Sequence, residues 1–235
     1  MSYSLLLLLK GPLQSWGDES RYTTRATGST PSKSGVIGLL AAALGRQRQE
    51  PVDDLASLDF AVRVDQPGSL LRDYQTAQPW QKDATAPAKL VTRYFLSDAA
   101  FLAAIGSESR AQLEEIQKAL REPAYPLFLG RRSCPAPPNL DQGIVEEPVV
   151  DALRNHGMWH ATKAHKKESL QTVELPIFRD GKPGENGVAR QDVPVSYAQE
   201  HRKYNWRTVV YAGSKTITNE ESTNRDPFFD EVVSS

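Results

Sequence analysis

The chain has 235 residues with 28 Lys and Arg, 29 Asp and Glu and a formal net charge of −1, which excludes a polycation that coats nucleic acid by overall charge. Its hydrophobic content of 39% and charged content of 24% are ordinary for a globular protein with a sizeable core. The one cysteine excludes an internal disulfide framework and a metal site made of thiolates alone, so we expect a cytoplasmic protein. No membrane span is expected, because the apolar run at residues 5–9 ends at Lys10.

An apolar strand and an apolar helix are predicted in the first fifty residues. The apolar run at residues 3–10 is short and ends at Gly11 and Pro12, which favours a central strand over a helix. The apolar run at residues 36–44 follows two serines that suit an N-cap and ends at Gly45, so we expect a helix there that is packed on most of its circumference.

The start of this predicted helix is a candidate anion site. Ser32 or Ser34 is expected to cap the helix, and Lys33 lies between them. Free backbone N–H groups and the positive end of the helix dipole favour an anion at such a position. A capped core helix without a ligand is the alternative.

Two strands, an arm, a second helix and a last strand are predicted in the middle of the chain. The runs 60–64 and 98–105 predict strands, and 109–120 has the apolar spacing of a helix. Between the two strands, residues 71–96 are polar and interrupted by proline, as in a protruding hairpin or functional loop. Residues 125–129 form the last predicted strand.

This order of elements is the βαββαβ pattern of an α+β, ferredoxin-like (RRM-like) fold, which hosts RNA-recognition modules among other functions. We expect residues 1–143 to form a ferredoxin-like RNA-binding core, with a protruding thumb hairpin at about 71–96. Residues 144–235 are expected to form a smaller C-terminal antiparallel β extension packed on this core. Strand-like pieces in this part of the chain lie at 172–178, 193–197 and 207–211.

Residues 129–135 (LGRRSCP) place two adjacent guanidiniums on a glycine turn between proline-containing flanks. Glycine permits a positive φ and a close approach of another segment, and the prolines restrict the loop. Arg131 and Arg132 on such a loop are suited to bidentate binding of a phosphate, with the Ser133 hydroxyl as an additional donor. The alternative is an arginine pair that caps a helix end or pairs with surface carboxylates.

Basic and aromatic side chains on loops favour single-stranded RNA, whose bases stack on rings and whose phosphates contact cations. Aromatic residues on loops or on the arm are Trp16, Tyr22, Tyr74, Trp80 and Tyr94. The predicted RNA-binding residues are Gln14, Ser15, Trp16, Arg25, Lys33, Ser34, Arg72, Tyr74, Arg93, Arg131, Arg132 and Ser133. For Trp16, packing beneath the first helix is the alternative.

The histidines argue against catalysis, because metal-independent RNA cleavage needs a general base and an acid that converge on one phosphate. All four histidines lie outside the segments named above: His156, His160, His165 and His201. The first three, with Lys163, Lys166 and Lys167, are interpreted as a solvated, RNA-facing or protein-facing surface patch. No cysteine or carboxylate joins them at a metal-binding spacing, and no P-loop or dinucleotide motif is present, so no metal and no cofactor are expected.

Four motifs in a fixed order carry a family resemblance. They are residues 11–17 (GPLQSWG), 30–40 (TPSKSGVIGLL), 71–74 (LRDY) and 129–135 (LGRRSCP). Together they resemble the Cas5 family of the RAMP superfamily, a subunit of the type I-E CRISPR surveillance complexes called Cascade. The resemblance covers residues 1 to about 135, and the rest of the chain matches only loosely.

The resemblance implies a non-catalytic subunit that binds and caps the 5′ handle of the guide crRNA in antiviral defence. It implies a CasC-type backbone subunit and a CasA-type large subunit as neighbours, only indirect contact with target DNA, and no membrane. The arm would be the thumb that reaches over the guide toward the backbone subunit. The alternative is a repeat-specific, metal-independent endoribonuclease that processes pre-crRNA, as in type I-C relatives.

Overall fold

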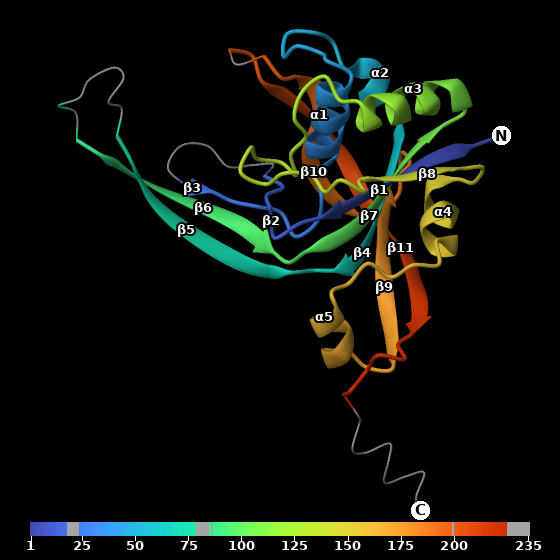
Figure 1. Cartoon of the computed structure of the whole chain (residues 1–235). Helices are drawn as coiled ribbons and strands as arrows, with labels where there is room; N and C mark the ends of the chain where they lie inside the picture. The colour runs from blue at the N-terminus through green and yellow to red at the C-terminus, as the bar shows by residue number, and fades with distance from the viewer. Residues whose placement is uncertain (18–23, 79–84, 86, 199, 225–235) are drawn as a thin grey trace, which may run out of the picture.

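The computed structural model describes residues 1–17, 24–78, 85, 87–198 and 200–224. They form a seven-stranded antiparallel sheet with helices on both faces, and a smaller sheet from which a two-stranded arm projects (Figure 1). In chain order the elements are β1 (Tyr3–Lys10), β2 (Leu13–Gln14), β3 (Thr24–Arg25), α1 (Lys33–Ala43), α2 (Asp53–Ala56), β4 (Asp59–Gln66), β5 (Ser69–Ala77), β6 (Lys89–Ser97), β7 (Ala100–Ser107), α3 (Arg110–Arg121), β8 (Asp141–Val145), α4 (Val149–Asn155), α5 (Lys163–Glu168), β9 (Thr172–Asp180), β10 (Val188–Ser196) and β11 (Lys203–Thr218).

The large sheet has the strand order β10-β11-β9-β4-β7-β1-β8. Its strand β1 is buried on both faces, because successive side chains of a strand point to opposite sides. Leu5, Leu7 and Leu9 pack in the cluster that contains α1 and α3, whereas Leu6 packs in the cluster that contains α4. The prediction of a central strand at residues 3–10 is confirmed.

Both predicted helices are confirmed, and their caps follow the sequence. The Ser32 hydroxyl accepts a hydrogen bond from Gly35 N at 3.2 Å, and Gly45 has the positive φ (+78°) that ends a helix. The Ser109 hydroxyl caps α3 in the same way through Gln112 N. None of the described helices is long and apolar enough to span a membrane.

The predicted strand at residues 125–129 is wrong. This segment forms only an isolated bridge between Phe128 and Pro135. Strand β1 pairs with β7 on one side and, on the other, with β8, which follows the arginine motif. The physical reason is proline, since Pro123 and Pro126 have no N–H group to donate to a strand ladder. The arginine motif therefore lies in the connection between α3 and β8.

Strands of the C-terminal part continue the large sheet. The strand-like pieces predicted at 172–178, 193–197 and 207–211 fall on β9, β10 and β11. Strand β9 pairs with β4, so strands from both sides of the expected division after residue 143 belong to one sheet. That division itself lies inside β8.

The arm consists of β5 and β6, which pair antiparallel from Ser69↔Ser97 at its base to Ala77↔Lys89 near its tip. Side chains alternate between its two faces. Asp73, opposite Arg93, and Leu71, opposite Phe95, share one face, and Arg72, Tyr74 and Tyr94 share the other. Figure 1 shows the arm projecting away from the large sheet.

Candidate functional site

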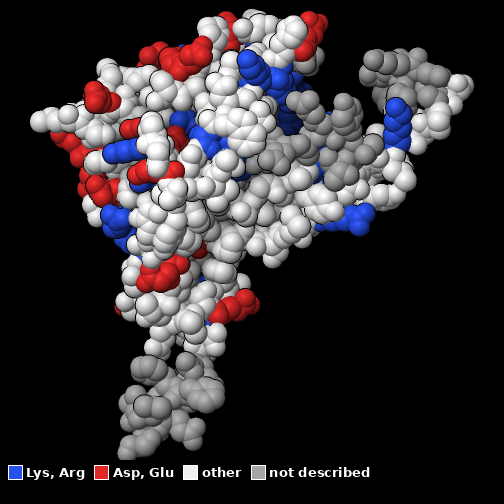
Figure 2. All heavy atoms as spheres, turned by 180° about the vertical axis from the view of Figure 1, so that it is seen from behind, with Lys and Arg blue, Asp and Glu red and all other residues white. Residues whose placement is uncertain are grey.

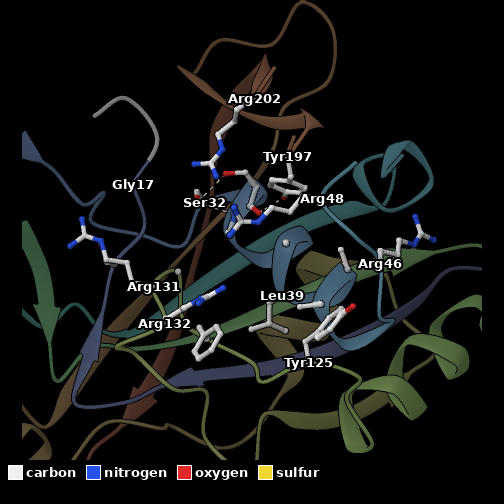
Figure 3. Close-up of a pocket in the computed structure, with 18 of the residues that line it drawn as sticks. Gly17, Ser32, Leu39, Arg46, Arg48, Tyr125, Arg131, Arg132, Tyr197 and Arg202 are labelled. Atoms are coloured by element: carbon white, nitrogen blue, oxygen red, sulfur yellow. Dashed lines mark hydrogen bonds between the residues drawn. The ribbon is translucent and has the colours of Figure 1, made fainter. Parts of the chain in front are cut away.

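A cleft of about 1200 Å³ opens between α1, the segment 125–132 and the connection from β10 to β11 (Figure 3). Its aromatic lining residues are Tyr125, Phe128, Tyr197 and Tyr204. Its lining arginines are Arg25, Arg46, Arg48, Arg131, Arg132 and Arg202. Among the described residues that line it, the one carboxylate is that of Glu200. A concave site with this excess of positive charge and with aromatic rings suits a polyanion with flat bases.

The cleft arginines differ in how they are paired. Arg46 binds both carboxylate oxygens of Asp54, and this pairing raises the pKa of the Arg46 guanidinium. Arg48, Arg132 and Arg202 are exposed and have no ion-pair partner within the described part of the chain. In the view of Figure 2, described carboxylates gather on the body, and the side that carries the arm shows Lys and Arg.

The arginine loop, residues 129–134, is held in one conformation by backbone hydrogen bonds. Leu129 N donates to Cys134 O at 2.7 Å, and Cys134 N donates to Arg131 O at 2.8 Å. Gly130 has φ +88°, and a Cβ at this position would lie 1.7 Å from the carbonyl oxygen of Ser15. Only glycine fits there, as the sequence indicated.

Arg131 is clamped to the base of the arm. Its Nη1 donates to Tyr94 O at 3.3 Å, its Nη2 donates to Arg25 O at 3.2 Å, and its guanidinium lies 4.8 Å from the centre of the Phe95 ring. Burial and then the charge of Arg93 lower the pKa of this guanidinium. Arg131 is therefore a positioned cation with three N–H groups left over.

The other two predicted residues of the loop are exposed. Arg132 lines the cleft, and its guanidinium has no hydrogen-bond or ion-pair partner within the described ranges. The Ser133 hydroxyl lies 3.9 Å from Cys134 Sγ and does not line the cleft.

Gln14 and Trp16 are parts of the core and do not line the cleft. Gln14 is fully buried, donates to Leu9 O and Ala99 O, and accepts a hydrogen bond from Trp16 Nε1 at 3.0 Å. The Trp16 ring packs so closely beneath α1 that a Cβ on Gly35 would lie 2.8 Å from it. The alternative considered for Trp16 is thus the observed one, and of this motif Ser15 and Gly17 line the cleft.

The start of α1 is occupied by the protein's own carboxylate. Lys33 N donates to Asp192 Oδ2 at 2.8 Å, where the sequence suggested a bound anion. The Lys33 ammonium is buried, donates to Leu58 O and pairs with Asp180 at 2.7 Å. Lys33 is therefore not presented to the cleft, in contrast to the prediction. Ser34 is buried but lines the cleft, and its carbonyl accepts a hydrogen bond from the Tyr197 hydroxyl.

The residues around Lys33 form a buried network, which we call the ionic clamp: Lys33, Asp180, Arg190, Asp192 and Arg207. Arg207 binds both oxygens of Asp192, at 2.6 and 2.9 Å, and Asp180 at 2.6 Å. Burial opposes the charged form of Arg207, but hydrogen bonds and charges of the two aspartates outweigh burial and raise its pKa. The clamp ties α1 to β9, β10 and β11.

The predicted residues of the arm do not converge on one site. Arg72 and Tyr74 are exposed on one face, with the Arg72 guanidinium 5.9 Å from the centre of the Tyr74 ring. Arg93 lies on the other face, toward Arg131 and Arg25. Tyr22 and Trp80 lie outside the described residues.

The interpretation of the three histidines as one surface patch is wrong. His160 is buried, and its Nε2 lies 3.1 Å from His156 Nε2, whereas His165 contacts the edge of Trp159. Burial, first of all, lowers the pKa of His160 to about 4. In the described part of the chain, no three His, Cys, Asp or Glu residues gather in a way that could hold a metal ion.

Comparison with known proteins places the chain in a family. The family model described as "CRISPR-associated protein (Cas_Cas5)" matches residues 4–210. The chain belongs to the Cas5 family. CasD, the Cascade subunit of Escherichia coli strain K12, is similar to this Cas5 protein at 38% identity over 148 residues, which are 56% of this chain and 66% of CasD.

Two solved structures agree with this assignment. A chain of a CRISPR RNA-guided surveillance complex has a TM-score of 0.75 at 29% identity, over 97% of this chain and 96% of that chain. The crystal structure of a Cas protein has a TM-score of 0.64 at 34% identity, over 95% of this chain and 100% of that chain. The resemblance stated from the four sequence motifs is confirmed at the level of the family.

The side of the cleft opposite the arginine loop was not predicted from the sequence. Tyr197 and Arg202 come from the β10–β11 connection and Tyr204 from the start of β11, far along the chain from the arginine loop. Arg48 belongs to a basic run after α1 that the sequence shows but does not place. No local pattern connects these segments, because the sheet pairing that brings them together is non-local.

Proposed function

We propose that this Cas5-family protein is a non-catalytic subunit of a Cascade-type CRISPR surveillance complex that binds the 5′ handle of the guide crRNA in its cleft. The observation that carries the proposal is the cleft lining of six arginines against one carboxylate among the described residues. The names of two relatives, a Cascade subunit and an RNA-guided surveillance complex, support the kind of assembly.

The cleft offers the two kinds of contact that single-stranded RNA uses. Arg132, Arg48 and Arg202 are exposed cations for backbone phosphates, and the tyrosine rings are platforms for unstacked bases. Figure 3 shows Arg131 and Arg132 on one side, with Arg48, Tyr197 and Arg202 across from them. A strand bound between them would meet cations on both sides.

The fold supports the finer assignment of a ferredoxin-like core with a thumb. Four neighbouring strands in the order β8-β1-β7-β4, with α1 and α3 packed on one face, have the connectivity of a βαββαβ unit. In this proposal the arm is the thumb and reaches toward a CasC-type backbone subunit. A CasA-type large subunit is the other neighbour, and target DNA is contacted only indirectly.

The proposal of a non-catalytic role rests on what lines the cleft. His156 and His160 lie next to α4, and none of the four histidines lines the cleft. The alternative function is repeat-specific endoribonuclease activity. Incubation of the purified chain with labelled repeat RNA in EDTA separates the two functions, because a discrete cleavage product from this chain would establish the alternative.

A triple variant tests RNA binding directly. Arg48→Gln, Arg132→Gln and Arg202→Gln remove three exposed charges that have no ion-pair partner within the described ranges, so the melting temperature is expected to stay the same. Affinity for labelled 5′-handle RNA, measured by fluorescence anisotropy, is expected to fall at least about tenfold. The slope of log K against log salt is expected to fall by about 2, because each neutralised phosphate contributes about 0.7.

The matched control removes three positive charges from α3, which does not line the cleft: Arg110→Gln, Lys118→Gln and Arg121→Gln. This variant changes the net charge equally and is expected to keep both affinity and slope. Equal loss in the two variants, or unchanged binding in the cleft variant, would refute the cleft as the RNA site.

A further inference from the structure

Three guanidiniums meet where the arm leaves the body. Strand β3 pairs in parallel with β6, and this register sets Arg25 beside Arg93. Arg131 joins them from the arginine loop, because it donates to the carbonyl oxygens of Arg25 and of Tyr94, the residue after Arg93. We call Arg25, Arg93 and Arg131 the arm-base cluster. Its members come from three segments that only the fold brings together.

The positive charge of this cluster is not balanced within the described residues. No ion pair joins any of the three guanidiniums to a carboxylate in the described ranges. Arg93 Nε is buried without a hydrogen-bond partner there. The charge of Asp73, the cross-strand partner of Arg93, acts on Arg131 without an ion pair, and the Asp73 carboxylate already accepts a hydrogen bond from Gln75.

Buried arginines elsewhere in the chain are compensated. Arg63 is fully buried and binds both oxygens of Asp65, and Arg207 binds two aspartates. A buried N–H group without a protein partner, beside two like charges, is costly, and native proteins complete such a group with a water, an ion or a ligand. The arm-base cluster therefore has the composition of an anion site whose anion comes from outside the chain.

The geometry favours a single phosphate group. Arg131 is fixed by two backbone carbonyls and by the Phe95 ring, so the remaining N–H groups of its planar fork are held in place. Arg25 and Arg131 also line the cleft, so the cluster is continuous with it. A phosphate has enough acceptor oxygens to satisfy donors from three guanidiniums at once.

We propose that Arg25, Arg93 and Arg131 together bind one backbone phosphate of single-stranded RNA, at the point where the strand passes from the cleft to the arm. This inference rests on the proposed function, and it adds a defined phosphate site to it. It assigns the Arg93 Nε–H group to a phosphate oxygen. Arg72 and Tyr74, on the opposite face of the arm, take no part in this site.

The test replaces one phosphate at a time by an uncharged methylphosphonate along a labelled 5′-handle RNA. The affinity of the full-length protein for each RNA is then measured. One linkage is expected to weaken binding about tenfold to wild-type protein, the size expected for a hydrogen-bonded charge. Arg93→Gln is expected to weaken binding of the unmodified RNA by a similar factor and to show no further loss at that linkage. Arg121→Gln, on α3, is the matched control and is expected to behave as wild type.

The free protein gives a second measurement. Because Arg93→Gln relieves repulsion among three like charges, the melting temperature without RNA is expected to stay the same or to rise. If this variant does not fold, Arg25→Gln carries the same test, since Arg25 is exposed. If wild-type protein binds the RNA, but every methylphosphonate weakens binding to Arg93→Gln or Arg25→Gln as much as it does to wild type, the phosphate site is overturned and the proposed function stays intact. Absence of RNA binding by wild-type protein would instead overturn both.

Discussion

The ionic clamp and the arm-base cluster each contain arginines that are at least partly buried, and the two regions differ in whether carboxylates pair with these arginines. In the clamp, Arg207 meets Asp180 and Asp192 within 2.6 to 2.9 Å. In the arm-base cluster, Arg131 binds two backbone carbonyl oxygens, lies against the Phe95 ring and is repelled by the charge of Arg93. The paired charges of the clamp hold elements of the fold together, whereas the arm-base cluster, without such pairs in the described ranges, is the site where we propose that an external phosphate binds.

The two regions also lie differently in the molecule. The clamp closes the start of α1 with Asp192, so the helix dipole there is already satisfied. The arm-base cluster opens into the cleft through Arg25 and Arg131. Lys33 and Arg131 were both predicted to bind an anion beside a helix start or a turn. In the structure Lys33 pairs with Asp180, whereas Arg131 binds backbone carbonyl oxygens and its role in RNA binding stays a prediction.

The largest expected effect on stability comes from removing one carboxylate of the ionic clamp. Asp192→Asn removes a fully buried negative charge that serves Arg207, Arg190 and the first N–H group of α1. Loss of one partner of a buried ion pair costs about 3–5 kcal/mol, so the free energy of unfolding is expected to fall by about 3 kcal/mol. Urea unfolding of the RNA-free chain measures it.

The control for this prediction is Asp151→Asn, an exposed carboxylate that pairs with Arg154 on α4. Its removal is expected to change the free energy of unfolding by less than about 0.5 kcal/mol. A loss below about 1 kcal/mol in Asp192→Asn would show that the clamp is not what holds α1 to the C-terminal strands.

The second prediction concerns the loop that carries Arg131. Gly130→Ala places a Cβ 1.7 Å from Ser15 O at a positive φ, so the loop must move. The free energy of unfolding is expected to fall by about 2 kcal/mol, and affinity for the 5′-handle RNA is expected to fall with it. Anisotropy and thermal unfolding on the same preparation measure both.

Gly143→Ala is the matched control for the loop. Gly143 also has a positive φ (+96°), but nothing lies within 4 Å of the added Cβ. It is expected to cost about 1 kcal/mol of stability through backbone strain alone and to leave RNA affinity unchanged. Unchanged affinity in Gly130→Ala would contradict the loop's role in positioning the arginines.

The contrast between local and long-range contacts also decides which parts of the fold could be predicted from the sequence. Strand β1, helices α1 and α3 and the glycine turn at Gly130 were predictable, because their signals are local: apolar period, cap residues and breakers. The strand after α3 was misplaced, because residues 141–145 contain a glycine and an aspartate and give a weak strand pattern. Leu127 and Phe128 gave a stronger apolar signal in the wrong segment.

The pairing state of each cation could not be predicted. Lys33 and Asp180 are 147 positions apart, and Arg25 meets Arg93 only through a parallel pairing of two short strands. Whether an arginine has a carboxylate within reach is set by such long-range contacts. The sequence therefore shows which cations lie near turns but does not separate the clamp residue Lys33 from the cleft residues Arg131 and Arg132.

The smallest expected effect is a decrease of stability with pH that RNA affinity does not share. The folded pKa of His160 is lowered to about 4, chiefly by burial, from an ordinary value near 6.5. The unfolded chain therefore takes up this proton first, and stability falls as the pH decreases through this window. Between pH 7 and pH 5.5 the loss is expected to be about 1 kcal/mol.

His160→Gln is expected to remove the part of this pH dependence that belongs to the His160 imidazole, while His156, whose pKa is lowered chiefly by burial, keeps its own part. Guanidinium groups in proteins stay charged, so the affinity of the folded wild-type protein for a phosphate backbone is expected to stay constant from pH 7 to pH 5.5. Anisotropy at both pH values, with thermal unfolding alongside, measures the two quantities separately. A fall in RNA affinity that follows the fall in stability would mean that the histidine side of the sheet contributes to the RNA site, and the division between paired and unpaired arginines would then be incomplete.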